Sequence, residues 1–137
     1  MFSYVVDVKG SIEQVLHRLE EKIKENKLRL LWKYDIATKL FEQGIRFTRP
    51  YYILELSHED LTKRLLTEHP DSGFLLPAKC MVYQDEERDM VRIGVLRPTA
   101  LADEVDNEQV KILAQQLEEK LIEMVNQCAK EEEVSLE

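Results

Sequence analysis

The sequence predicts an α/β (α+β) fold in which a single mixed sheet carries helices mainly on one face. Three observations support this class: short apolar runs with the two-residue period of strands, longer runs with the 3.6-residue period of helices, and their alternation along the chain. The predicted order is β-α-β-α-β-α-β-β-α. With 137 residues, 44% of them apolar, the chain is long enough to bury a core. We expect one domain over residues 1–130 and a frayed acidic tail over residues 131–137.

The first strand and helix follow from simple patterns. Residues 3–8 alternate side chains around a valine-rich run, which predicts a short, largely buried strand. Ser11, with Gln14 three residues later, has the capping-box spacing that opens a helix. Apolar residues at helical spacing then predict one stripe packed on the sheet. They are Ile12, Val15, Leu16, Leu19 and Ile23.

A second strand over residues 28–34 precedes a short helix. Asp35 is a natural N-cap, and Gly44 can end a helix over residues 36–43 in a left-handed turn. Residues 45–50 are expected to form a loop. Strand alternation places one set of side chains of the second strand on a common face. That set is Leu28, Leu30, Trp32 and Tyr34.

Residues 51–56 predict the third strand, and Ser57 is expected to cap the helix after it. Glu59 and Asp60 then lie in the first turn, where carboxylates stabilise the positive end of the helix dipole. Three leucines are predicted to face inward. They are Leu61, Leu65 and Leu66.

Residues 74–98 have the form of an antiparallel hairpin, because two apolar, β-rich runs flank the charged connector over residues 85–88. Alternation along the first run places Cys80 among apolar side chains on one face and Lys79 on the other. A buried thiol in such a row is usually inert packing.

The last helix is expected to begin after Asp106 or Asn107, either of which can cap it. Its apolar residues alternate three and four positions apart, the spacing of a narrow packing seam. The seam either packs across the chain's own sheet or joins two subunits, and both interpretations stay open. It consists of Val110, Ala114, Leu117, Leu121, Met124 and Cys128.

The charge distribution excludes some partners. The net charge is -8, and residues 103–137 account for all of it, because acidic and basic side chains balance over residues 1–102. A neutral body with an acidic end lacks the basic surface that binds phosphate backbones, so no nucleic-acid partner is expected. Anionic membrane surfaces are disfavoured for the same reason.

No catalytic signature is present: there is no Gly-rich phosphate loop, GxSxG, HExxH or close cysteine pair, so the sequence favours a non-enzyme and predicts no cofactor. Consecutive helix positions point about 100° apart, so His58, Glu59 and Asp60 are not expected to share a metal ion.

Cys80 and Cys128 lie far apart in sequence and favour free thiols in a reducing compartment. Without a cationic leader or a long apolar run, the sequence predicts a cytoplasmic protein.

A candidate ligand site is built from six residues. Helix N-termini attract anions, and a cation beside a sheet face needs solvent, a carboxylate or an anionic ligand. The pocket is therefore expected to favour carboxylates or phosphates. The six residues are Asp35, Arg49, Ser57, His58, Lys79 and Cys80.

Several motifs between residues 28 and 98 occur together in one order. They are YDIATKL from Tyr34, RPYYIL from Arg49, the segment from Leu61 to Leu66, Gly73, and LLP from Leu75. With this order and spacing the chain resembles the domain of unknown function 302 family. The resemblance implies a small α/β domain that forms homodimers and has no established activity.

The chain also departs from that family. Many members carry Cys-Asn-Pro where this chain has Ser57-His58-Glu59, and a cysteine where it has Ala78. The resemblance therefore suggests Cys80, two residues further along the same strand face, as a stand-in for the missing thiol.

Three functional hypotheses follow. The leading one is a cytoplasmic, homodimeric binding or interaction module. The alternative is a sensor or enzyme for a small anionic metabolite, with a pocket near Asp35, Arg49, His58 and Lys79. In the third, the acidic last helix docks a basic protein partner.

Overall fold

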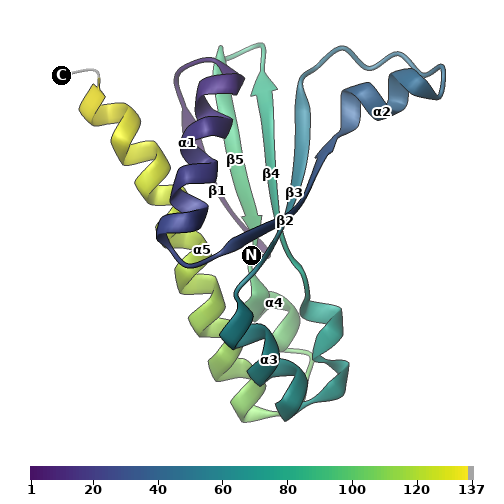
Figure 1. Cartoon of the computed structure of the whole chain (residues 1–137), viewed down its shortest axis with the longest axis vertical. Coiled ribbons are helices and arrows are strands. Elements are labelled where there is room, and N and C mark those ends of the chain that lie inside the picture. Colours follow the sequence, from purple (N-terminus) through teal and green to yellow (C-terminus); the bar gives the residue numbers. More distant parts are fainter. Residues whose placement is uncertain (136–137) are drawn as a thin grey trace.

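One five-stranded sheet with the strand order β1-β5-β4-β3-β2 forms the centre of the fold (Figure 1). The computed structural model describes the backbone of residues 1–135 and the side chains of residues 1–130. All four neighbouring strand pairs are antiparallel, where the sequence predicted a mixed sheet. The predicted class, a sheet with helices mainly on one face, is confirmed. The strands are β1 (Ser3–Val8), β2 (Arg29–Asp35), β3 (Tyr51–Ser57), β4 (Ala78–Asp85) and β5 (Met90–Leu96).

The helices fall into three groups. The long helices α1 (Ile12–Glu25) and α5 (Glu108–Ser135) lie side by side on one face of the sheet. α3 (Glu59–Glu68), the 3-10 helix η1 (Pro70–Leu75) and α4 (Pro98–Ala102) gather at one end of it. α2 (Ile36–Glu42) stands apart between β2 and β3. The sequence predicted neither η1 nor α4, because helices this short show no periodicity.

The core lies between the sheet and the pair α1 and α5. The five predicted apolar positions of α1 are all buried, and both halves of its capping box are formed. All six seam residues of α5 are fully buried within the same chain. The seam therefore packs across its own sheet and is not the contact between two subunits. The α5 cap is Asn107, whose Oδ1 accepts the N–H of Val110 at 3.0 Å.

Three predictions about the β2 to α3 region are wrong. A bulge at Leu31 separates Leu30, which faces the helices, from Trp32, which turns to the other side of the sheet. Ser57 is the last residue of β3 and does not cap α3. His58 is the cap, and its Nδ1 accepts the N–H of Leu61 at 3.2 Å. Leu66 is exposed, because α3 packs a single stripe of its surface.

The C-terminal end of α5 continues further than the sequence indicated. Its backbone is helical through Ser135. The predicted tail, residues 131–137, otherwise lies outside the described residues. No helix in the described part of the chain is long and apolar enough to cross a membrane.

A buried carboxylate ties α4 to α5. Glu118 of α5 accepts hydrogen bonds from Nη2 of Arg97 at 3.3 Å and from Oγ1 of Thr99 at 2.6 Å. The backbone N–H of Thr99 donates to the same carboxylate at 3.2 Å. This buried charge is therefore paired and hydrogen-bonded, as a buried carboxylate must be.

Candidate functional site

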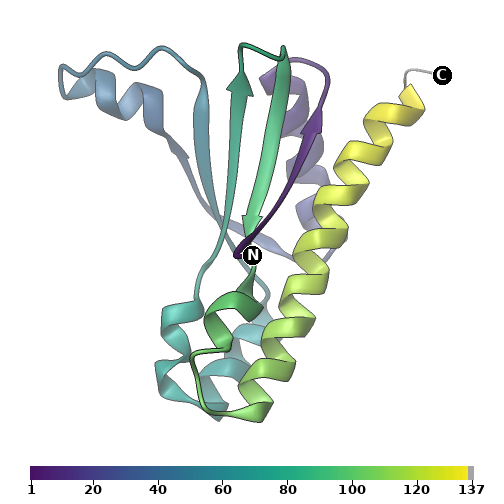
Figure 2. The ribbon, with the colours of Figure 1, turned by 180° about the vertical axis from the view of Figure 1, so that it is seen from behind.

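The sheet face opposite α1 and α5 carries no helix among the described residues. In Figure 2 the strands β3, β4, β5 and β1 are seen with no helix in front of them, and α1 lies behind. Strand register defines the side chains on this open face. They are Ser3, Val5 and Asp7 of β1, Arg29, Trp32 and Tyr34 of β2, Tyr51, Ile53, Glu55 and Ser57 of β3, Lys79, Met81, Tyr83 and Asp85 of β4, and Met90, Arg92, Gly94 and Leu96 of β5.

An apolar row crosses the middle of the open face. It runs through Tyr34, Ile53, Met81, Gly94 and Val5, which are register partners on successive strands. A Cβ at Gly94 would lie 2.8 Å from Cγ1 of Val5 and 2.9 Å from Cε of Met81. The glycine therefore lets these two side chains meet across β5 and keeps the row continuous.

A shallow groove of about 310 Å³ lies on this row. Its lining is mostly apolar, and Lys79 is the charged residue among the side chains that form it. Such a groove fits apolar side chains of a partner, or a small apolar molecule with an anionic group. Lining residues include Phe2, Ile53, Met81, Gly94 and Leu96.

Aromatic rings stack at one end of the open face. The rings of Tyr51 and Tyr83 lie parallel with their centroids 5.1 Å apart, and Phe47 meets Tyr51 edge-on at 6.4 Å. The guanidinium of Arg49 lies 5.6 Å from the centre of the Tyr83 ring. Burial, and then the neighbouring Tyr83, raise the pKa of Tyr51 against the opposing effect of Arg49. The Tyr51 ring therefore stays neutral at physiological pH.

Charged groups beside the rings are largely neutralised by one another. Nε of Arg92 donates to Oδ1 of Asp7 at 2.9 Å, and Arg88 donates to the other carboxylate oxygen. The hydrogen bond from Arg92 lowers the pKa of Asp7, burial opposes it, and Arg88 adds to the lowering. The same contact raises the pKa of Arg92. This corner of the open face is a fixed ion cluster.

The structure separates two of the predicted site residues. Asp35 caps α2 by accepting the N–H of Thr38 at 3.0 Å, and it lies opposite Tyr52 in the β2–β3 pair. His58 follows Ser57 at the other end of the same strand pair. The helix starts at Asp35 and His58 therefore do not share a pocket.

Ser57 lies at the end of the sheet that is next to α3. Ser57 is the register partner of Arg29, whose guanidinium forms an ion pair with Glu59 at 2.7 Å. The local chemistry here is a surface ion pair beside a helix cap.

Lys79 and Cys80 lie on opposite faces of β4. Lys79 lines the groove, whereas Cys80 faces the helices and is fully buried. Burial, with a smaller effect of Cys128, raises the pKa of Cys80 to about 12. A protonated thiol in this position is neither a nucleophile nor a ligand for the groove. Of the six predicted residues, Lys79, Ser57 and Arg49 belong to the open face and its rim, with Ser57 at the end next to α3.

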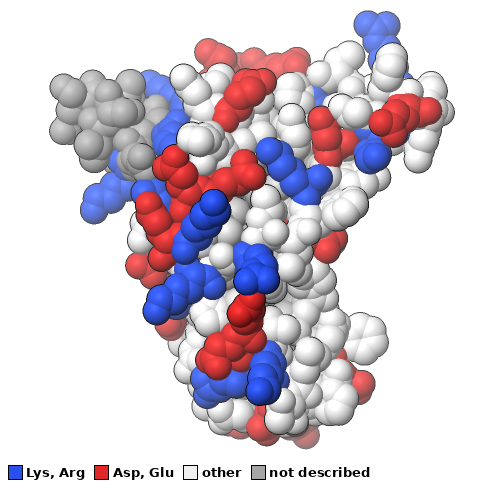
Figure 3. Space-filling model, viewed as in Figure 1, with Lys and Arg blue, Asp and Glu red and all other residues white. Residues whose placement is uncertain are grey.

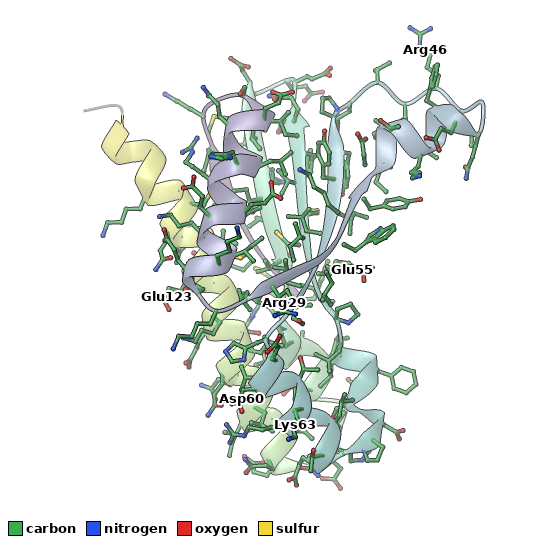
Figure 4. All side chains as sticks on the ribbon, in the orientation of Figure 1. Arg29, Arg46, Glu55, Asp60, Lys63 and Glu123 are labelled. Atoms are coloured by element: carbon green, nitrogen blue, oxygen red, sulfur yellow. The ribbon has the colours of Figure 1, made fainter. Side chains whose placement is uncertain are left out.

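The segment from Ile36 to Pro50, here named the arm, projects from the body (Figures 1 and 2). None of its residues is buried, and the side chain of Phe41 is 78% exposed. Arg46 lies at the far end of the arm and points away from the body (Figure 4). The sequence predicted the helix and the loop of the arm but not their projection from the body. The apolar residues Phe41, Ile45 and Phe47 in this short segment were the available signal, because exposed apolar groups mark contact surfaces.

A hollow separates the arm from the α3 end of the molecule. In the space-filling view the outline curves inward there, and the surface along the curve is largely uncharged (Figure 3). Elsewhere in the described side chains, no three His, Cys, Asp or Glu residues gather closely enough to hold a metal ion. The open face and the arm are therefore the surfaces that call for a functional explanation.

The chain is similar to a protein family and to solved structures of known proteins. The family model described as Domain of unknown function DUF302 matches residues 4–128. A crystal structure of an uncharacterized conserved protein DUF302 from Bacillus stearothermophilus is 33% identical, with a TM-score of 0.87 over 93% of this chain and 98% of that chain. None of the curated proteins matches.

Proposed function

Because the chain belongs to the DUF302 family, whose description assigns no activity, we propose from its own surfaces that it is a cytoplasmic interaction module that pairs with a second copy of itself through the open face. The apolar row across the open face is the observation that carries this proposal. A sheet with one face on the core normally exposes alternating polar side chains on the other. Here the middle row of the exposed side is apolar across all five strands.

A second copy is the partner that the row favours. Two identical apolar rows can meet face to face about a two-fold axis, and two sheets pack about 10 Å apart in this way. Removing both rows from water supplies the driving force for association. The cytoplasmic part of the proposal is supported by the two buried free thiols, which suit a reducing compartment.

Analytical ultracentrifugation of the wild type and of Ile53→Glu tests the proposal. Ile53 lies in the middle row, so a carboxylate there would have to be buried without a partner in the dimer. We expect a dimer at micromolar concentration for the wild type and a folded monomer for Ile53→Glu. Leu66→Glu, on exposed α3, serves as the matched control and should remain dimeric. A monomeric wild type, or an Ile53→Glu dimer, would refute the proposal.

A second candidate function is favoured by the groove. Lys79 beside an apolar lining suits a small metabolite with an anionic group and an apolar body. This candidate rests on Lys79 and does not involve Asp35 or His58. A thermal-shift screen of anionic metabolites against wild type and Lys79→Gln tests it. A ligand should raise the melting temperature of the wild type and raise it less in Lys79→Gln, since a ligand that binds only the folded state stabilises it.

A further inference from the structure

We infer that the arm, residues 36–50, is a clamp that packs against the second copy and forms the other half of the self-association interface. This inference rests on the proposed function and extends it. It assigns a role to the least buried segment of the described chain, which the sheet-face proposal alone leaves unexplained.

The arm has too little contact within its own chain to explain its conformation. α2 has seven residues and buries none of them. Isolated helices shorter than about 12 residues are marginal in water, so packing on another surface normally stabilises a helix of this length. The three exposed apolar side chains of the arm, Phe41, Ile45 and Phe47, are the contacts that a covering surface would use.

The size of the open face leaves room for a second contact surface. Five strands about 4.8 Å apart, each with about six residues at 3.3 Å, give a face of roughly 24 Å by 20 Å, or on the order of 500 Å². A stable interface buries about 800 Å² on each partner. The flat footprint of the sheet face is smaller than this, and a projecting 15-residue arm would add contact area to it.

Charge favours another copy of this chain as the surface that the arm contacts. The arm holds Lys39, Arg46 and Arg49 against the single carboxylate of Glu42, a net charge of +2. Because the whole chain carries -8, the rest of it carries -10, of which residues 103–137 carry -8. A basic arm laid on a second copy that is acidic overall reduces the repulsion between two like-charged chains.

The arm is also continuous with the open face. Phe47 of the arm meets the ring of Tyr51, which lies on the open face itself. An exposed face and a projecting arm on the same chain can be satisfied reciprocally about one two-fold axis, with each arm reaching the other copy. Such an arrangement forms a closed dimer, in which the open face and the arm of each copy both contact the other copy.

Dissociation constants of charge-bearing arm variants test the clamp. In Phe41→Glu/Ile45→Glu no buried contact of the monomer is lost, so the variant should fold. We expect its dissociation constant to rise at least tenfold, or about 1.4 kcal/mol, since two large apolar side chains would be lost from the interface. The matched control is Leu66→Glu/Ile112→Glu, whose apolar residues are 42% and 41% exposed on α3 and α5, and it should leave the constant unchanged.

Photo-cross-linking locates the surface that the arm contacts. A benzophenone-bearing amino acid replaces Phe41, and equal amounts of ¹⁴N- and ¹⁵N-labelled protein are mixed before irradiation. We expect peptides that join one light and one heavy chain. Cross-links confined to single chains, or an unchanged dissociation constant for the arm variant, would overturn the clamp. Ile53→Glu tests the sheet face separately from the arm. If the wild type is a dimer and the arm does not contact the second copy, the clamp is wrong and the proposed function is unaffected. If the wild type is a monomer, both are wrong.

Discussion

Individual side chains on β4 show how the two faces of the sheet differ in chemistry. Cys80 and Lys79 are neighbours in sequence, yet one is a protonated thiol in the core and the other is a cation at a groove. Sequence alternation predicted this separation correctly. The predicted ligand site nevertheless grouped the two residues, and the structure separates them.

Asp7 gives the residue-scale prediction. Because its hydrogen bond to Arg92 lowers the pKa of Asp7 in the folded state, the stabilisation it supplies, about 1 kcal/mol, is fully present above the unfolded-state pKa near 4. It is lost as the pH falls through the lower folded-state pKa. Asp7→Asn should therefore lower the free energy of unfolding at neutral pH by about this amount and match the wild type in strong acid.

Urea unfolding of Asp7→Asn and wild type over the acid range checks this. The exposed hairpin carboxylate Glu86 offers a control, since Glu86→Gln should follow the wild type throughout. A difference between Asp7→Asn and wild type that persists unchanged below the folded-state pKa would show that the charge is not its source.

At the scale of elements, Glu118 fastens α4 onto α5. Glu118→Ala would leave the Arg97 guanidinium and the Thr99 N–H without their acceptor, so we expect a loss of about 2 kcal/mol in the free energy of unfolding. Glu119→Ala, the exposed neighbour on the same helix turn, should change it by no more than about 0.5 kcal/mol. Chemical denaturation measures both. Equal losses in the two variants would contradict a tie through the buried carboxylate.

Most helices and strands were predictable from the sequence, including the short α2, whereas η1, α4, the bulge in β2 and the cap of α3 were not. The α5 seam and the capping box of α1 were recognised because each is encoded within one continuous segment. The bulge at Leu31 depends on pairing with β3, which no local pattern reveals. Ser57 is a good capping residue, but β3 extends through it and leaves His58 to cap α3.

At the scale of the whole molecule, the candidate site depended on strand direction. Asp35 follows β2 and His58 follows β3, and because these strands are antiparallel, the two helix starts lie at opposite ends of the pair. In a parallel pair they would have met at one edge. The placement of Lys79 on a face without helices was within reach of sequence alternation, whereas the absence of a covering helix was not.

Self-association makes the stability of the whole molecule depend on its concentration. For a dimer that dissociates on unfolding, a hundredfold higher concentration should raise the melting temperature by roughly 5 °C. Differential scanning calorimetry of the wild type measures this, and Ile53→Glu should melt at one temperature at every concentration. A wild-type melting temperature that does not move would contradict association of the folded chains.

The bulge in β2 has an optical consequence. By turning Trp32 away from the helices, it places the single tryptophan of the chain, 56% exposed, in the same row as Glu55 and Lys79. Indole emission shifts to shorter wavelength when the ring leaves water. The unmodified protein therefore carries its own fluorophore at the rim of the surface proposed to pair, and its emission spectrum reports on what covers that surface without any label.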